Sequence, residues 1–364
     1  MMEEGLQTPI IAIGLMSGTS LDGIDVALVR TDGVRVSPFG PWLTRRYQES
    51  LRTQIARALG SCGTPELSRA LTLAHNDAVD ALLLDAGLDK SSIRVIGFHG
   101  HTLMHRPKDK LTVQSGDGDY LAELTGIDVV SNFRTRDVAE GGQGAPLVPL
   151  YHAALSKSLS APIVVLNLGG IANLTWIGAD GDLLAFDSGP GNTLIDRWSV
   201  RHLNECMDRN GSLASQGTVN KERLSRAMSE SYILTHPPKS LDINDLSLNF
   251  VDDLSPEDGA ATLTAFTAAT VAKAMSFLPS NPTTLLVSGG GRHNPILMRM
   301  LAVELGFDVT PVESVGWRGD AVEAEAFAFL AVRTLLGLPL SLPKTTGVAS
   351  PCRGGQIHFA QSSL

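Results

Sequence analysis

Residues 186–193 hold the side chain that we predict to be a catalytic base, Asp187. An apolar run at 183–186 predicts a strand that ends at this carboxylate, and glycines lead from it toward an expected helix. A carboxylate there can take a proton from a sugar hydroxyl or from water, or orient a metal, and glycines beside a helix N-terminus suit phosphate. The alternative is a turn-initiating Asp followed by a helix that Asn192 or Thr193 caps. Glycines on both sides of Pro190 are more than a cap requires, which favours the chemical role.

Small-residue turns follow three apolar strands, at residues 17–20, 169–170 and 289–291. Phosphate binding needs such turns, because only glycine lets backbone N–H groups approach an anion closely at positive φ. Any one of them taken alone is equally well a tight hairpin. The three together predict phosphate contacts, although no Walker-type Gly-x-x-x-x-Gly-Lys-Ser/Thr and no strand-associated Gly-x-Gly-x-x-Gly occurs.

Polar clusters elsewhere leave alternatives open. Three histidines at 99–105 are interpreted as sugar contacts, as satisfied loop histidines or, less favoured because further ligands are missing, as a metal site. Arg134, Arg136 and Asp137 bracket a glycine loop at 141–144, where an arginine suits a carboxylate-bearing substrate; an ordinary solvated salt bridge is the alternative.

The start of the last long helix carries a further carboxylate, Glu323. Asp320 as N-cap and Glu323 at N3 would form a capping box. The other interpretation points Glu323 into a cleft beside Asp187.

Strands alternating with helices predict an α/β fold whose sheets are covered on both faces. The expected strands are 10–15, 24–30, 93–98, 128–131, 163–168, 174–177 and 283–287, and the expected helices are 51–59, 65–86, 120–125, 150–159, 259–277, 295–305 and 320–336. Residues 13–20 and 166–173 share one pattern, an apolar strand feeding a small-residue turn and a second strand. This repeat suggests two related lobes.

Composition limits the class of protein. A chain of 364 residues suits two domains rather than one core. The net charge is −9 without a Lys/Arg block, so no nucleic-acid partner is expected. Three scattered cysteines predict no disulfide framework and fit a reducing cytoplasm, and no apolar run approaches the roughly 20 residues that span a bilayer.

With these motifs together, the chain resembles the anhydro-N-acetylmuramic acid kinase family, in the superfamily that includes acetate and sugar kinases, heat-shock chaperone ATPases and actin. The matching stretches run in the expected order from residue 10 to about 350, and are 14–25, 99–100, 141–149, 167–173, 186–192, 288–295, 320–331, 341–343 and 346–347. Three positions depart from the family pattern: His101 replaces Gln, Asn132 replaces Asp, and Gly319 replaces Pro.

The resemblance implies a two-lobed actin-like ATPase fold, with each lobe a mixed ribonuclease-H-like sheet flanked by helices. The expected N-terminal lobe is 1–135, with 345–364 packing back on it, and the C-terminal lobe is 136–344, with ATP, Mg²⁺ and the sugar in the cleft between them. The implied reaction opens the 1,6-anhydro ring of anhydro-N-acetylmuramic acid with water and phosphorylates O6, giving N-acetylmuramate 6-phosphate for cell-wall recycling in the cytoplasm.

The resemblance also assigns residues. Asp187 is the implied base that activates water, and Glu323 assists it. The implied nucleotide contacts are Gly18, Thr19, Ser20, Leu21, Asp22, Gly23, Ile24, Asp25, Gly169, Gly170, Asn173, Gly189, Gly191, Asn192, Gly289, Gly290, Gly291 and Asn294. The expected sugar contacts are His99, Thr102, Arg134, Asp137, Gly142 and Gln143. A same-fold kinase for another amino sugar or anhydrosugar, a non-kinase ATP-driven clamp, and a homodimeric assembly stay open as alternatives.

Overall fold

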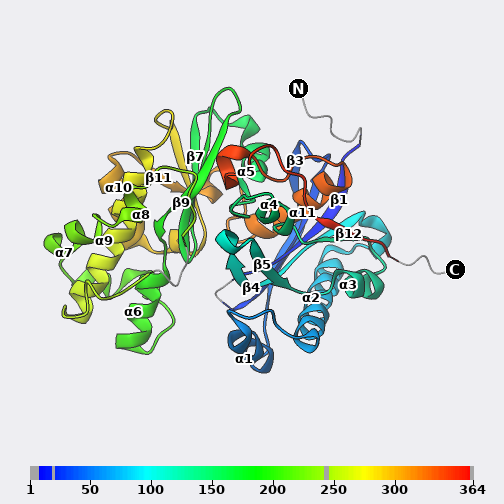
Figure 1. Cartoon of the computed structure of the whole chain (residues 1–364), viewed down its shortest axis with the longest axis horizontal. Helices are drawn as coiled ribbons and strands as arrows, with labels where there is room; N and C mark the ends of the chain where they lie inside the picture. Colours follow the sequence, from blue (N-terminus) through cyan, green and yellow to red (C-terminus); the bar gives the residue numbers. More distant parts are fainter. Residues whose placement is uncertain (1–7, 19–20, 242–245, 361–364) are drawn as a thin grey trace. The chain divides into compact units, whose positions relative to one another are not determined.

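The computed structural model describes residues 8–18, 21–241 and 246–360. The chain divides into two compact units, one made of Met1–Ser158 with Ala321–Leu364 and the other of Leu159–Asp320. Each unit contains one mixed sheet with helices around it (Figure 1). The predicted fold class, α/β with a mixed sheet in each part, is confirmed.

The first unit is built on a sheet with strand order β12-β6-β4-β1-β2-β3, and β5 pairs with β4 outside this path. β1, β2 and β3 are antiparallel to one another, whereas β4 runs parallel to both β1 and β6. The strands are β1 Ile10–Ser17, β2 Gly23–Thr31, β3 Val36–Arg46, β4 Val95–Arg106, β5 Leu111–Ser115, β6 Val129–Ser131 and β12 Gln356–His358.

Two long helices cover the faces of this sheet. α11 packs against β1 and β4 without intervening side chains, because a Cβ on Gly14 would lie 1.7 Å from the Ala324 carbonyl oxygen and one on Gly97 would lie 2.0 Å from that of Phe327. α2 covers the other face with an apolar stripe. The helices of this unit are α1 Glu49–Ala58, α2 Pro65–Ala86, α3 Gly118–Thr125, α4 Thr135–Ala139, α5 Pro149–Leu155, α11 Val322–Leu335 and α12 Pro343–Thr346.

The second unit repeats this strand topology. Its sheet has the order β11-β10-β7-β8-β9; β7, β8 and β9 are antiparallel, and β10 is parallel to β7 and β11. The strands are β7 Ile163–Leu168, β8 Ile171–Ile177, β9 Leu183–Pro190, β10 Thr284–Ser288 and β11 Val309–Pro311, and the helices are α6 Thr193–Leu203, α7 Lys221–Ala227, α8 Ser231–Leu234, α9 Pro256–Met275 and α10 Pro295–Leu305. β7-β8-β9-β10 thus repeats the arrangement of β1-β2-β3-β4, as the repeated sequence pattern suggests.

The boundaries between the units differ from those expected. Residues 136–158 and 321–344, which we had assigned to the second lobe, belong to the first unit. The reason is packing: nearly all residues of α11 are buried and its apolar side chains join the core of the first sheet, and α5 joins the same core. Short apolar runs in the sequence do not reveal which sheet a helix will cover.

Two strand ends were predicted wrongly. The strand at 93–98 does not end before the histidines but continues as β4 to Arg106, because β5 pairs with this extension. The strand expected to end at Asp187 continues as β9 to Pro190. The strands β3, β5, β11 and β12 were not foreseen. Of the two interpretations of Glu323, the capping box with Asp320 does not form, since α11 has Ala321 at its N-cap and no side-chain cap bond. Within the described ranges, no helix has the length and hydropathy needed to cross a bilayer.

Candidate functional site

Asp187 lies within β9, the last strand of the second sheet, three residues before the strand ends at Pro190. The pairing of β9 with β8 places Asn173 opposite it. Its side chain is partly buried, and Oδ2 accepts a 2.9 Å hydrogen bond from the backbone N–H of Leu241. The sheet and this bond hold the carboxylate in one orientation, which proton transfer requires.

Burial raises the pKa of Asp187 to about 7, and the Leu241 N–H and the positive charge of Lys239 oppose this only in part. A carboxyl group with a pKa near the working pH combines a sizeable ionised fraction with useful basicity. Asp196 also has a pKa raised to about 7, first by burial and then by Asp208. A raised pKa therefore does not single out the base, and the placement of Asp187 beside the glycine turns is what distinguishes it.

The glycine turns of the second unit meet one another. The N–H groups of Gly191 and Asn192 donate to the carbonyl oxygens of Gly170 and Gly169, both at 2.8 Å. A Cβ on Gly191 would lie 2.2 Å from the Gly169 oxygen, and one on Gly289, where φ is +76°, would collide with β7. Glycine is required at these positions because the backbones of the turns touch.

Gly290 differs from its neighbours, because a Cβ there would meet nothing within 4 Å. Its backbone is therefore open to an incoming group, as a phosphate contact needs. At Gly291 a Cβ would lie 2.6 Å from β7, and at Gly189 it would lie 2.5 Å from the Thr270 hydroxyl of α9. These two glycines permit close packing, so Gly290 is the residue of the turn best placed for direct contact.

Two asparagines brace the same turns. Asn192 stands at the N-cap of α6 without a side-chain cap bond; its amide donates instead to the carbonyl oxygens of Leu168 and Gly169, at 2.8 and 3.1 Å. Asn294 caps α10 through its Oδ1, which accepts the N–H of Leu297 at 3.2 Å. Both side chains stabilise the loops through the chain's own backbone groups.

In the first unit, Ser17 ends β1 directly before Gly18. The Ser17 Oγ lies 2.5 Å from the hydroxyl oxygen of Tyr47 and 2.7 Å from Nδ1 of His101. Burial lowers the pKa of His101 to about 4 and raises that of Tyr47, so both rings are neutral near neutrality. His101, one of the departures from the family pattern, therefore orients the hydroxyl that precedes the glycine turn.

The predicted nucleotide segment at 18–25 is described only in part. Thr19 and Ser20 lie outside the described residues. Leu21, at φ +58°, donates its N–H to the Gly18 carbonyl oxygen at 3.3 Å. Asp22 precedes β2, and Gly23 and Ile24 begin this strand. Within β2, Asp25 accepts a 2.5 Å bond from the Thr44 hydroxyl.

His99 and Arg134 form a buried pair in the first unit. The Arg134 Nε donates to His99 Nε2 at 2.9 Å, and His99 Nδ1 lies 2.9 Å from the Gly100 carbonyl oxygen. The ring is therefore the Nδ1–H tautomer, and burial followed by the Arg134 charge holds its pKa well below the ordinary range. Burial lowers the pKa of Arg134 to about 10 while Glu323 and Asp137 oppose this, so the guanidinium stays charged at neutral pH. A fixed cation results, which suits a carboxylate or an oxygen-rich ligand.

Asp137 is 2% exposed. Its carboxylate oxygens accept hydrogen bonds from other groups of this chain. The Gly144 N–H donates to Oδ1 at 2.6 Å, and the hydroxyls of Thr346, at 2.6 Å, and Ser341 donate to Oδ2. These bonds tie the 141–144 loop to the 341–346 segment. Asp137 is built in as a scaffold for the loop, which differs from the direct sugar contact that we expected of it.

The loop itself is held at Gln143, whose N–H donates to the Thr346 carbonyl oxygen at 2.6 Å and whose carbonyl oxygen lies 2.9 Å from His105 Nε2. Gly142 cannot carry a side chain, because a Cβ would lie 2.1 Å from Asp137 Oδ1. On β4, the hydroxyl of Thr102 accepts a 3.3 Å bond from a glutamine amide of β5. The first unit therefore brings His99, Arg134 and the loop into one network.

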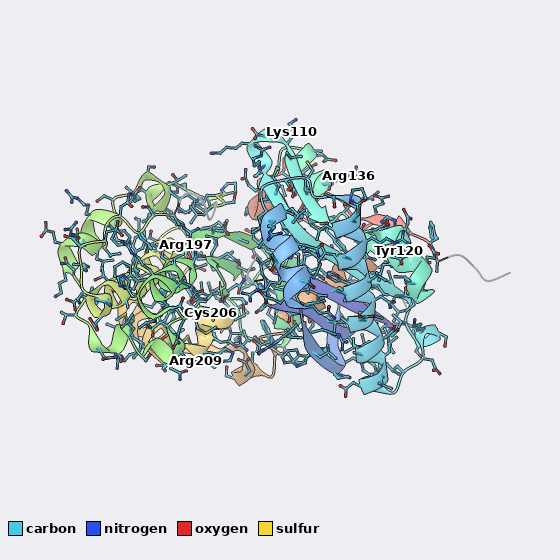
Figure 2. All side chains as sticks on the ribbon, turned by 90° about the horizontal axis from the view of Figure 1, so that it is seen from below. Lys110, Tyr120, Arg136, Arg197, Cys206 and Arg209 are labelled. Atoms are coloured by element: carbon cyan, nitrogen blue, oxygen red, sulfur yellow. The ribbon has the colours of Figure 1, made fainter. Side chains whose placement is uncertain are left out.

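Arg136 stands outside this network. It lies on the surface (Figure 2) and pairs with Glu140 at 2.9 Å, with both side chains exposed. For this arginine the solvated salt bridge is the right interpretation. The carboxylate of Asp320 pairs with Arg292 at 2.8 Å rather than capping α11, while Glu323 lies on α11 within the electrostatic range of Arg134.

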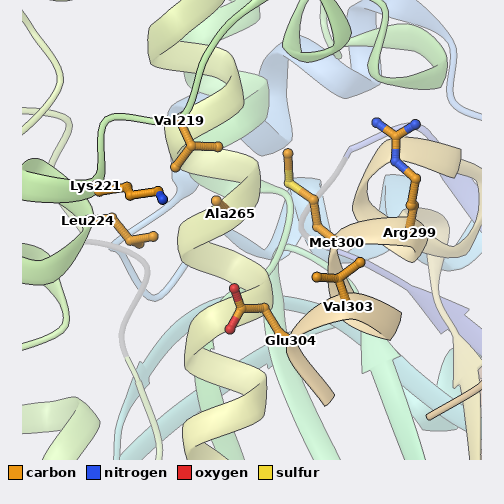
Figure 3. A pocket seen from close by; sticks show the side chains of 8 residues that line it. All are labelled: Val219, Lys221, Leu224, Ala265, Arg299, Met300, Val303 and Glu304. Atoms are coloured by element: carbon orange, nitrogen blue, oxygen red, sulfur yellow. The ribbon is translucent and has the colours of Figure 1, made fainter. Parts of the chain in front are cut away.

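No group of three or more His, Cys, Asp or Glu side chains in the described part of the chain is arranged to hold a metal ion. A cavity of about 400 Å³ lies in the second unit between α7, α9 and α10 (Figure 3). None of the predicted contact residues lines it, and its floor is apolar, with Leu224, Ala265 and Met300 among the lining side chains.

The segment 232–241, which approaches Asp187, was not predicted. It lies about fifty residues further along the chain and carries no glycine turn or histidine cluster. Only its lysine, Lys239, in an apolar and proline-containing stretch, was a possible signal.

Comparisons with known proteins agree with this picture. A family model described as "Anhydro-N-acetylmuramic acid kinase" matches residues 10–360. A protein of Paramagnetospirillum magneticum with that name is 50% identical over 353 residues, covering 96% of this chain and 99% of the relative. A Zymomonas mobilis protein with the same name is 48% identical over 365 residues, covering 96% and 100%. Among solved structures, the Acidaminococcus fermentans (R)-2-hydroxyglutaryl-CoA dehydratase component A matches with a TM-score of 0.48 at 14% identity, covering 90% and 99%.

The family model and the named relatives show that the chain is an ATP-dependent sugar kinase, here built on two mixed α/β sheets of repeated topology. Within that class, the match over nearly the whole chain shows that this chain belongs to the anhydro-N-acetylmuramic acid kinase family.

Proposed function

We propose that this kinase opens the 1,6-anhydro ring of anhydro-N-acetylmuramic acid with water and transfers the γ-phosphoryl group of ATP to O6. The product is N-acetylmuramate 6-phosphate, which places the enzyme in cell-wall recycling. The observation that carries the proposal is Asp187, a carboxylate with a pKa raised to about 7 and a fixed Oδ2, in a chain of this family.

In the proposed reaction Asp187 accepts a proton from water as the water oxygen bonds to the anomeric carbon. The C1–O6 bond breaks, and its electron pair leaves with O6. O6 then bonds to the γ-phosphorus as ADP departs, so the hydroxyl at C1 and the phosphate at O6 come from water and ATP respectively. Mg²⁺ held on the phosphates would neutralise their charge, and the remaining work is positioning and charge stabilisation by the chain.

Nucleotide contact is assigned to the turns at 169–170 and 289–291, with Gly290 as the open position, and to 18–25. Sugar contact is assigned to His99, Arg134 and the 141–144 loop, where the fixed guanidinium suits the lactyl carboxylate of the muramic acid. Glu323, whose negative charge acts on Arg134, is proposed to assist the base Asp187. A location in the cytoplasm fits this reaction, because ATP is found there.

The experiment is a phosphorylation assay with ATP and anhydro-N-acetylmuramic acid in ¹⁸O-water, read by mass spectrometry at early times. One ¹⁸O is expected in the sugar and none in the phosphate, with N-acetylmuramate 6-phosphate incubated alone as the control for slow exchange at C1. Phosphorylation of ordinary N-acetylmuramic acid in preference to the anhydrosugar would contradict the proposed substrate. ATP hydrolysis without any phosphorylated sugar would contradict kinase activity altogether.

A further inference from the structure

The segment 232–241 is bonded to Asp187 at several points. The backbone N–H of Leu241 donates to the carboxylate Oδ2 at 2.9 Å. The Asp187 N–H donates to the Lys239 carbonyl oxygen at 3.1 Å, and the Tyr232 hydroxyl donates to the Asp187 carbonyl oxygen at 2.9 Å. The segment therefore contacts both the backbone and the side chain of this residue.

The side chain of Lys239 bonds the end of the segment 232–241 to its beginning. This side chain is 8% exposed, and its Nζ donates to the carbonyl oxygens of Tyr232 and Ile233 at 3.0 and 3.3 Å. The ammonium group also lies 4.7, 5.0 and 5.9 Å from the ring centres of Tyr232, Phe277 and Phe186. Hydrogen bonds and rings thus fix the charge next to β9.

A buried ammonium group is a costly way to anchor a loop. Removing a charge from water costs several kcal/mol unless an opposite charge offsets it, and among the described residues no salt bridge to Lys239 is formed. Burial lowers the pKa of Lys239 to about 8, while the carboxylate of Asp187 pulls it upward. An uncharged side chain such as Met would fill an aromatic cage at lower cost, so the charge itself needs an explanation.

We propose that Lys239 is a positioning residue for the proposed base: it anchors the segment 232–241 against Asp187 and supplies the positive charge that favours the ionised carboxylate. The inference rests on the proposed function, because only there is Asp187 the base. Among the described residues, the other titratable groups around this site are Tyr232 on α8, Lys273 on α9, at 5.3 Å from the Phe277 ring, and His236, at 4.8 Å from the same ring. Across β8 the facing residue, Asn173, is neutral.

The test compares Lys239→Met with Lys273→Met in the full-length enzyme, by the pH dependence of kcat/KM. Lys273 is the matched control, because it lies over the same Phe277 ring but is not among the charges that shift the pKa of Asp187. The acidic limb of this profile is the pH range in which kcat/KM rises as the base ionises. In Lys239→Met it is expected to lie about one pH unit higher, since a nearby opposite charge lowers a carboxyl pKa by that much or more. At pH values below the limb, kcat/KM of Lys239→Met should therefore be about tenfold lower than that of the wild-type enzyme, and above the limb it should be little changed. Purely structural damage would instead lower kcat/KM at every pH.

Lys239→Arg keeps the charge and is expected to return the limb toward its wild-type position. Lys239→Gln is a second neutral variant that keeps a donor for the two carbonyl groups, and it is expected to shift the limb as Lys239→Met does. The proposal is overturned by an unmoved limb in the neutral variants, by an equal shift in Lys273→Met, or by a failure of both neutral variants to fold, which would make Lys239 a structural residue.

A failure of the proposed function would be recognised separately, because the wild-type enzyme would then phosphorylate no anhydrosugar. In that case the carboxyl titration of Asp187 is followed directly by ¹³C NMR of aspartate-labelled protein, with Asp187→Asn used for assignment. A titration midpoint that rises in Lys239→Met still supports the inferred effect of the Lys239 charge on the Asp187 carboxyl, and an unchanged midpoint refutes it.

Discussion

The pH dependence of turnover is the sharpest consequence of the environment of Asp187. Burial raises its pKa from 3.8 to about 7, and a general base works only when it is deprotonated. The rate should therefore rise with pH through the folded-state pKa. At about pH 5, a base with a pKa near 7 is only about 1% ionised, so kcat/KM should be roughly a hundredfold below its plateau, whereas a base with the ordinary value would be almost fully ionised.

The matched substitution is Asp187→Asn, because an amide oxygen can still accept the Leu241 N–H and keep the fold. Turnover should fall by about 10²–10⁴ while ATP binding, measured by calorimetry, is retained. Asp196→Asn is the control, since Asp196 is the other carboxyl of this unit with a pKa raised to about 7. It should leave the acidic limb of kcat/KM unchanged.

A limb near pH 4 in the wild-type enzyme would refute the argument from burial, since it would mean that the carboxylate of Asp187 is well solvated. A limb near neutrality that survives in Asp187→Asn and disappears in Asp196→Asn would move the base to the other carboxyl. Loss of nucleotide binding in Asp187→Asn would show that the residue holds the nucleotide rather than the reacting water.

Four further predictions concern stability and binding. Burial and then Asp208 raise the folded-state pKa of Asp196 from 3.8 to about 7, so its contribution to stability is complete below about pH 4 and is lost as the pH rises toward 7. Asp196→Asn should therefore increase the free energy of unfolding at about pH 8 by on the order of 1 kcal/mol after solvent screening, measured as a higher Tm, and change it little at about pH 4. Gly191→Ala should lower Tm, because its Cβ would meet a carbonyl oxygen at 2.2 Å and the free energy of unfolding should fall by about 1–3 kcal/mol. Gly290→Ala should keep the wild-type Tm and weaken ATP binding. A wild-type affinity for ATP in this variant would mean that Gly290 does not contact the phosphates. Asp137→Ala should cost about 3 kcal/mol or more by denaturant unfolding, because it leaves several buried donors without an acceptor, and an unchanged unfolding midpoint would contradict its role as a scaffold.

The sequence by itself determined the kind of protein, the central strands of its two sheets and the presence of Asp187 on a strand beside a glycine turn. Strand runs, glycine turns and a carboxylate at a strand end are local patterns, and the chemistry they permit depends on residue type and spacing over a few positions. That is why the α/β class and the family could be predicted from residues such as Gly290 and Asp187.

Tertiary structure alone decided what surrounds these residues. The sequence places Asp137 in a polar motif, but only the fold shows that its carboxylate is occupied by Gly144, Ser341 and Thr346. The helix at 322–335 belongs to the first sheet because Gly14 and Gly97 let it touch β1 and β4, a contact between segments more than two hundred residues apart. The pKa of Asp187 and the approach of Lys239 likewise depend on burial and on long-range contact, which no local pattern contains.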